Sequence, residues 1–426
     1  MTSYSRQILP LENPVMEYAW GSKTFIPGLL GRPVPAPAPA AELWMGAHPR
    51  APSRVTIRGG ETPLDRLIAD DPGGTLGPRA AEEFGGKLPF LLKVLAVERP
   101  LSIQAHPDRF QAREGYRREN AAGMPVDGPF RNYRDPQPKP ELLCALTPFR
   151  ALCGFREPEE IAAGLKALRL GELLPAAAGF ISFPGEESLR RLFGELLALA
   201  GPERTALLDR LAGPAGESPG ASFLPPGSGA LIASLREIHP GDPGVLSPLF
   251  LNLVRLEPEE SIYLAPGVLH AYLKGAGVEI MAGSDNVLRG GLTVKHIDGE
   301  ELGRILSCRC GPVRAGPARG GGVERVYPSP AEEFQLSRLL PAEGEPFHSG
   351  RRQGPEIVFC YRGRTLVEGG DGPPVELERG DSLFIPFGAG EYAARGEAVL
   401  YRAALPPRGP NSPGNAGASP EEERRK

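Results

Sequence analysis

Apolar residues follow two different spacings along the chain. Residues 1–155 contain short apolar runs between turns, and the continuous run LPFLLKVLAV at 88–97 predicts a buried strand. From 156 to about 239 the apolar positions recur at helical spacing. The best example is SLRRLFGELLALA, with Leu189, Leu192, Phe193, Leu196 and Leu197. Strand-like runs return from Pro248 to Asp298 and again at 323–405. The pattern predicts a mainly β protein with a helical insertion.

Several connecting segments have compositions of their own. Residues 61–84 predict one short helix that a Gly-rich turn ends. We expect GRPVPAPAPA at 31–40 to be a surface loop insertion, and a loop at 214–228 to interrupt the helical region. The Gly/Pro-rich residues 311–322 predict a linker. The polar residues 406–426 predict a disordered tail.

An internal similarity links two distant β segments. LEPEESIYLAPGVLH at 256–270 aligns with LERGDSLFIPFGAGE at 377–391 when one residue is skipped before the proline. Ser261 then matches Ser382, and Gly390 falls where His270 stands. This predicts two related jelly-roll barrels, one that keeps a histidine and one that lacks it.

Charge and cysteine content limit the functional class. The 48 Lys and Arg residues against 52 Asp and Glu residues give a net charge of −4, which argues against a nucleic-acid partner. Five cysteines without a recognisable zinc pattern suit a reducing compartment. No signal sequence or membrane-spanning apolar run is evident, so we expect a cytoplasmic protein without a membrane partner.

Candidate chemistry centres on PLSIQAHPD at 100–108. Gln104 and His106 are two residues apart, so on a strand their side chains share a face. Glu141 and His270 stand in later β segments. A lone histidine is more often structural, but two imidazoles and a carboxylate inside a barrel would suit a zinc-type divalent metal with an open position. Spacing alone selects His106 and His270, then Glu141, and does not single out Gln104.

Longer motifs resemble one enzyme family. NPVMEYAWGS, AELWMGAHP, PLSIQAHPD, KPEL, APGVLHAYL and VEIMAGSDNVLRGGLTVKHID occur in order between residue 13 and about residue 298, and are similar to type I mannose-6-phosphate isomerases. The resemblance implies two cupin (jelly-roll) barrels with an inserted α-helical domain. The catalytic cupin would comprise residues 1–155 and 240–310, the helical insertion 156–239, and a metal-free cupin-like domain 323–405.

The resemblance also implies site residues. It places one Zn²⁺ per chain on Gln104, His106, Glu141 and His270. It implies Arg289 as the active-site arginine, with Lys139, Asp285 and Glu279 as unranked acid–base candidates. Nearby candidates for substrate binding are Ser102, Lys93, Lys295 and Glu42. Trp44 should line the pocket and Trp20 should be core, while we expect structural roles for His48, His239, His296 and His348.

The implied activity is interconversion of mannose 6-phosphate and fructose 6-phosphate through a cis-enediol, by a monomer whose partner is a small sugar phosphate. One departure is Pro138, where bacterial relatives often have His, so a mechanism that uses that histidine is not expected here. A non-catalytic cupin that binds or senses a phosphorylated sugar is the alternative. An iron cupin oxygenase is disfavoured because a neutral glutamine ligand suits a redox-inert metal.

Overall fold

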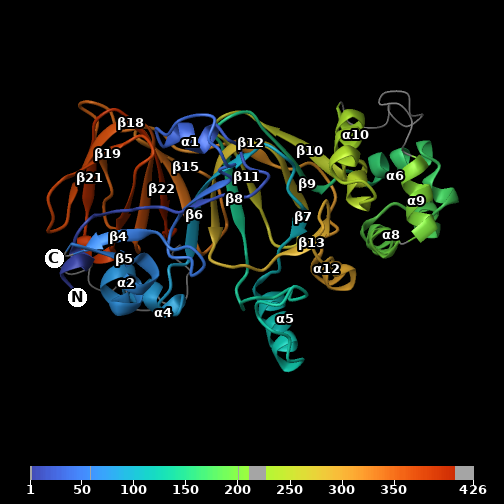
Figure 1. The fold of residues 1–426 in the computed structure, drawn as a ribbon, viewed down its shortest axis with the longest axis horizontal. Helices are drawn as coiled ribbons and strands as arrows, with labels where there is room; N and C mark the ends of the chain where they lie inside the picture. The colour runs from blue at the N-terminus through green and yellow to red at the C-terminus, as the bar shows by residue number, and fades with distance from the viewer. Residues whose placement is uncertain (1, 58, 200, 211–226, 408–426) are drawn as a thin grey trace, which may run out of the picture.

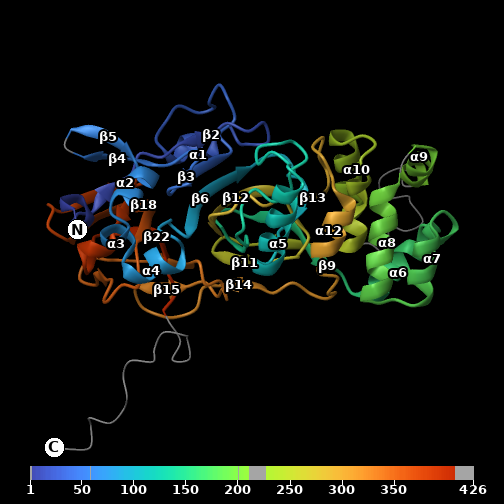
Figure 2. The same ribbon diagram turned by 90° about the horizontal axis from the view of Figure 1, so that it is seen from below.

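Two large antiparallel sheets form the framework of the molecule in the computed structural model, which describes residues 2–57, 59–199, 201–210 and 227–407. An 11-stranded sheet and a 9-stranded sheet lie side by side, and helices cover the end of the first sheet that is remote from the second (Figure 1). The view in Figure 2 shows the same order along the long axis. The mainly β composition predicted from the hydrophobic pattern is confirmed.

The first sheet contains the segments that carry the candidate chemistry. Its strands are β2 (Val15–Met16), β3 (Glu42–Met45), β6 (Phe90–Val97), β7 (Ile103–Ala105), β8 (Glu141–Ala145), β9 (Phe149–Phe155), β10 (Leu251–Leu256), β11 (Glu260–Leu264), β12 (His270–Ala282), β13 (Leu288–Gly291) and β14 (Ala315–Pro317). The predicted buried strand at 88–97 is β6, whose eight residues are all buried.

The second sheet is built mostly from the C-terminal third of the chain. Its strands are β1 (Leu9–Pro10), β15 (Glu324–Val326), β16 (Gln335–Leu339), β17 (Phe347–His348), β18 (Glu356–Gly369), β19 (Val375–Glu378), β20 (Ser382–Ile385), β21 (Tyr392–Arg395) and β22 (Ala398–Ala404). A separate hairpin pairs β4 (Arg54–Ile57) with β5 (Gly60–Pro63). The internal similarity falls on like elements, because Ser261 lies on β11 before β12 and Ser382 lies on β20 before β21.

Strand β12 connects two parts of the first sheet. Its first residues pair with β7 and β9, and residues 275–282 pair with β6 and β8. The register shifts between Tyr272 and Lys274. Such a bulge reverses which alternate residues face inward. As a result, His270 and Tyr272 in the first part share a face with Glu279 in the second part.

Helices occupy the segment for which helical spacing was found. The elements there are α6 (Pro158–Ala167), η2 (Leu170–Glu172), α7 (Pro175–Ser182), α8 (Glu186–Ala198), α9 (Gly201–Arg210) and α10 (Ser228–Ile238). On α8, Leu189, Leu192, Phe193 and Leu196 are buried, which confirms the predicted apolar stripe. These side chains join Leu152 and Phe155 of β9 in one core cluster, so the helices pack directly on the first sheet.

Other helices are short, apart from α5, which projects from the body (Figure 1). They are η1 (Ser3–Arg6), α1 (Phe25–Leu29), α2 (Leu64–Asp70), α3 (Pro72–Leu76), α4 (Pro78–Glu83), α5 (Arg109–Ala121), η4 (Pro243–Leu246), α11 (Ser247–Phe250), α12 (Gly299–Ile305) and η5 (Phe387–Ala389). The prediction of one helix in 61–84 is wrong, since strand β5 and three helices occupy it. The Gly-rich part forms α3, because the Asp71 side chain accepts a hydrogen bond from Gly74 N (2.9 Å) and Pro72 follows it.

Two further expectations differ from the structure. The expected linker 311–322 includes β14, which pairs with β11 at the sheet edge. Strand β1 pairs with β20 of the second sheet, although the expected division places residues 1–155 with the first. The expected loop at 214–228 falls largely on residues 211–226, and the expected tail at 406–426 largely on 408–426, both outside the described residues.

Candidate active site

Three buried side chains on the first sheet form a metal-type cluster. His106 directly follows β7, Glu141 begins β8 and His270 begins β12. One ligand atom from each lies within 4.8 Å of the others, and all three side chains are at most 2% exposed. The antiparallel pairing of β12 with β7, β8 and β9 gathers residues that are far apart in the sequence.

The rings of both histidines are oriented by backbone carbonyls. His106 Nδ1 donates to Asn286 O (2.7 Å), and His270 Nδ1 donates to Val268 O (2.9 Å). Each Nε2 then faces Glu141 at 3.4 Å. Neither Nε2 nor Oε2 of Glu141 has a hydrogen-bond partner among the described residues. Buried polar atoms are normally bonded, so these converging atoms fit a divalent metal ion.

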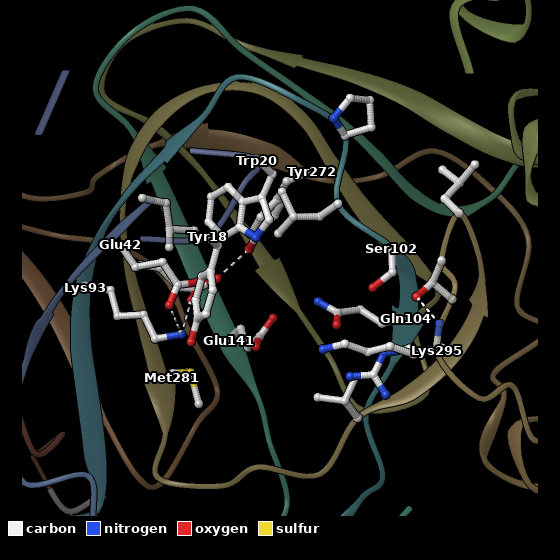
Figure 3. Close-up of a pocket in the computed structure, with 18 of the residues that line it drawn as sticks. Tyr18, Trp20, Glu42, Lys93, Ser102, Gln104, Glu141, Tyr272, Met281 and Lys295 are labelled. Atoms are coloured by element: carbon white, nitrogen blue, oxygen red, sulfur yellow. Dashed lines mark hydrogen bonds and ion pairs between the residues drawn. The ribbon is translucent and has the colours of Figure 1, made fainter. Parts of the chain in front are cut away.

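Gln104, the fourth ligand expected from the family resemblance, lies close to this group along the sheet. It is the register partner of His270 across β7 and β12, and it lines the same pocket as Glu141. Figure 3 shows its side chain on the Ser102 and Lys295 side of Glu141. An amide oxygen here adds a neutral donor to a set with one carboxylate.

Charged groups next to the cluster favour the protonation states in which the side chains can bind a metal ion. Lys139 Nζ lies 2.8 Å from Glu141 Oε1. Burial would raise the pKa of Glu141, but Lys139 and the two histidines outweigh it and hold that pKa well below its usual value. Burial, followed by the charge of Lys139, lowers the pKa of His106 to about 4. The carboxylate is therefore ionised and the imidazole neutral at pH 7.

Most of the candidate residues line one cavity of about 660 Å³. The ten that line it are Glu42, Lys93, Ser102, Gln104, Lys139, Glu141, Glu279, Asp285, Arg289 and Lys295. His106 and His270 lie behind Glu141. The structure thus brings together all twelve residues named from the sequence.

A second buried charge group forms one wall (Figure 3). Lys93 lies 3.3 Å from Glu279 Oε2 and 3.8 Å from Glu42 Oε2, and the hydroxyl of Tyr272 donates to Glu279 Oε1 (2.9 Å). Burial opposes the charge on Lys93, but Glu42 and Glu279 raise its pKa. Burial is the main reason that the pKa of Glu279 is raised. Trp44 Nε1 donates to Glu42 and thereby fixes this carboxylate.

Asp285 is held by His48 and Arg50, whose side chains also lie beside the ring of Trp44. His48 Nε2 lies 3.4 Å from Asp285 Oδ2, and Arg50 lies 3.2 Å from Oδ1. Burial would raise the pKa of Asp285, but His48 and Arg50 lower it to about 2. His48, for which we expected a structural role, lines the pocket. His239 and Trp20 line it too, although Trp20 also packs on a core cluster.

Arg289 and Lys295 form a basic end of the pocket. Neither has an ion pair with any acid in the described part of the chain. Burial and nearby arginines lower both of their pKa values, with Arg134 acting on each. Arg134 and Arg50 lie outside the motifs and are not identified from the sequence, and Tyr18, which lies within one, is not singled out there. The uncompensated charge favours an anionic ligand at this end.

A buried His–Glu–His group beside a charged cavity in an antiparallel β framework is typical of metal-dependent enzymes. Comparison with known proteins supplies the family. Residues 8–158 match the family model "Phosphomannose isomerase type I, catalytic domain". Mannose-6-phosphate isomerase of Escherichia coli K12 is 40% identical over 397 residues, which cover 92% of this chain and 98% of the relative. The human enzyme of the same name is 33% identical, with 89% and 93% covered.

Solved structures of mannose-6-phosphate isomerases also superpose on this chain. A zinc-bound mannose 6-phosphate isomerase superposes with a TM-score of 0.85 at 38% identity, covering 93% of this chain and 99% of the other. A mutant phosphomannose isomerase from Salmonella typhimurium gives 0.86 at 38% identity, with the same coverage. This chain therefore belongs to the type I mannose-6-phosphate isomerase family of enzymes, which confirms the resemblance found in its motifs. No helix within the described ranges is long and apolar enough to cross a bilayer.

Proposed function

We propose that the protein interconverts mannose 6-phosphate and fructose 6-phosphate through a cis-enediol, using one Zn²⁺ per chain. The observation that carries this proposal is a group of buried atoms, both histidine Nε2 atoms and Glu141 Oε2, that have no hydrogen-bond partner in the described part of the chain and lie beside a cavity with a basic end. The first feature suits a metal and the second suits a phosphate. Membership of the isomerase family and the zinc-bound relative support both assignments.

His106, Glu141, His270 and Gln104 would hold the zinc ion. With one anionic ligand the site keeps net positive charge, and the bound ion would polarise the sugar oxygens at C1 and C2. Arg289 would stabilise negative charge on the enediolate with its planar guanidinium. Arg289 has no acidic partner within the described ranges, which supports this role because none of the described side chains neutralises its charge.

Lys295 and Ser102 would bind the phosphate, with Arg134 adding positive potential. The sequence also suggests Lys93 for this role. In the structure, however, Lys93 lies between Glu42 and Glu279, and both carboxylates compensate its charge. We propose instead that Lys93 orients these two carboxylates.

Electrostatics allow the acid–base candidates to be ranked. A general base works best when its pKa lies near the operating pH. Asp285, with a pKa of about 2, would be a weak base and would serve to orient substrate. Lys139 is ion-paired with Glu141, so we do not propose it as the base. Glu279, whose pKa is raised by burial, is our proposed base for the proton at C2.

For the architecture, we propose two cupin barrels, 1–155 plus 240–310 and 323–405, with a helical insertion at 156–239. The matching positions of β11 and β20, each followed by a turn and a strand, support a common origin of the barrels. Strand β1 would be exchanged into the second barrel. We propose a cytoplasmic monomer.

A coupled assay that follows fructose 6-phosphate formation by the purified protein tests the function. We expect activity that chelation removes and zinc restores. Binding of mannose 6-phosphate with no turnover, with zinc bound, would favour the alternative of a sugar-sensing cupin. Turnover that is unaffected by complete zinc removal would reject the metal assignment.

A further inference from the structure

Asn286 connects the metal-type cluster to a neighbouring loop. Asn286 is fully buried, at 0% exposed, and its backbone carbonyl accepts the hydrogen bond from His106 Nδ1 at 2.7 Å. A carbonyl can only accept, so the proton of the neutral ring must be on Nδ1. The Asn286 carbonyl therefore leaves the lone pair of Nε2 directed at the cluster.

Both polar atoms of the Asn286 side chain form hydrogen bonds. Its Oδ1 accepts from the backbone N–H of Arg134 (2.7 Å) and of Asp135 (3.2 Å). Its Nδ2 donates to the backbone carbonyls of Asp135 (2.8 Å) and Gln137 (2.9 Å). Two donors and two acceptor positions are used, which only an amide of this length can supply.

A second connection joins the same two loops. The Asp135 carboxylate accepts from Ser284 Oγ (2.9 Å) and from the backbone N–H of Asp285 (2.9 Å). Loop 134–137 thus fixes residues 284–286 from two sides. Asn286 does not line the cavity, so its bonds serve the position of its own backbone and not contact with a ligand.

We infer that Asn286 is a positioning residue of the metal centre, whose side chain holds the carbonyl that orients His106. This rests on the proposed function in that a metal binds at this cluster. Partners that orient a ligand in this way typically contribute about 10–100-fold to metal affinity. Loop 134–137 then supports the metal centre through its hydrogen bonds to Asn286, although none of its residues is a ligand.

The test compares zinc affinity of full-length variants by competition with a chelator. Asn286→Ala removes every hydrogen bond of the side chain, and Asn286→Asp keeps the shape but places an oxygen against two carbonyls. We expect both to bind zinc about 10–100-fold more weakly. The matched control is Asn13→Ala, which also breaks two bonds of a bridging amide, to Ser382 (2.7 Å) and from Ser53 (2.8 Å), but on the second-sheet side. It should bind zinc like the wild type.

A measurement on the wild type does not depend on how the variants fold. The metal-free protein with ¹⁵N-labelled histidine has six histidines, and His106 can be assigned by its loss in His106→Gln. We expect a slowly exchanging proton on Nδ1. A proton on Nε2, or unchanged zinc affinity in folded Asn286 variants, would overturn the inference. If the wild type neither binds zinc nor isomerises the sugar phosphate, the proposed function itself fails.

Discussion

Replacing Lys139 by methionine should tighten zinc binding and destabilise the metal-free protein. The side chains of Lys139 and Glu141 are 9% and 2% exposed, and their charged atoms lie 2.8 Å apart. At an effective dielectric constant of about 20, this separation corresponds to an attraction of about 6 kcal/mol. Removing one partner of a buried pair typically costs about 3–5 kcal/mol. Lys139→Met should destabilise the metal-free protein by that amount.

The zinc-bound protein should lose less stability, because the bound cation compensates Glu141 in place of the lysine. If about 2 kcal/mol of the cost is avoided in this way, the variant should bind zinc about 30-fold more tightly. Burial without Lys139 raises the pKa of Glu141. The stability gap between wild type and variant should therefore be greatest at neutral and higher pH, and shrink as the pH falls through that raised pKa.

Chelator competition gives the zinc affinity, and thermal unfolding of the metal-free proteins gives the stability. Lys274→Met is the matched control, because Lys274 also lies 2.8 Å from its partner Glu98, but both are more than half exposed. It should lose less than about 1 kcal/mol and bind zinc normally. A folded Lys139→Met protein that binds zinc equally or more weakly than the wild type would refute the view that Lys139 competes with the metal.

Three further predictions separate metal binding, chemistry and substrate binding. Arg289→Lys should lower kcat by about 10²–10³ with zinc content unchanged, because a point charge does not replace the directed fork; a change in KM alone would make Arg289 a phosphate clamp. His270→Ala should lose zinc and activity yet keep the wild-type circular dichroism spectrum; zinc retained at full turnover would contradict its assignment as a ligand. Asp242 accepts from the backbone N–H of Thr293 (3.0 Å), two residues before Lys295. Asp242→Ala should therefore raise KM roughly tenfold, about 1.4 kcal/mol, without changing zinc affinity, and an unchanged KM would show that this anchor is not needed.

Local patterns predict those parts of the fold in which burial follows a simple period. Helix α8 is identified because its apolar residues recur on one face and are buried on the first sheet. Residues 61–84 are not predicted correctly, because the capping of α3 by Asp71 changes a Gly-rich turn into helix. The pairing of β1 with β20 is equally hidden, since two residues carry no signal for which of two sheets they join.

The same distinction holds for the candidate site. His106 and His270 stand out as chemistry-bearing residues, and the family resemblance adds Gln104. The bulge in β12 is not visible from alternation, so the common face of Tyr272 and Glu279 cannot be derived from spacing. The contacts of Arg50 and His48 with Asp285 join residues more than 230 positions apart, as the separation of 235 for Arg50 shows. Such pairs depend on the completed fold.

The pairing of β1 with β20 has a consequence for synthesis of the chain. Asn13, three residues after β1, donates a hydrogen bond to Ser382, the first residue of β20, which lies 369 residues later in the chain. At roughly 5–20 residues per second on a ribosome, β1 waits about 20–70 s for its partner strand. The first sheet, whose strands end at residue 317, can assemble during that interval. Because β1 can join the second sheet only after β20 has been made, a bulky fusion at the N-terminus should delay maturation more than one placed after residue 407.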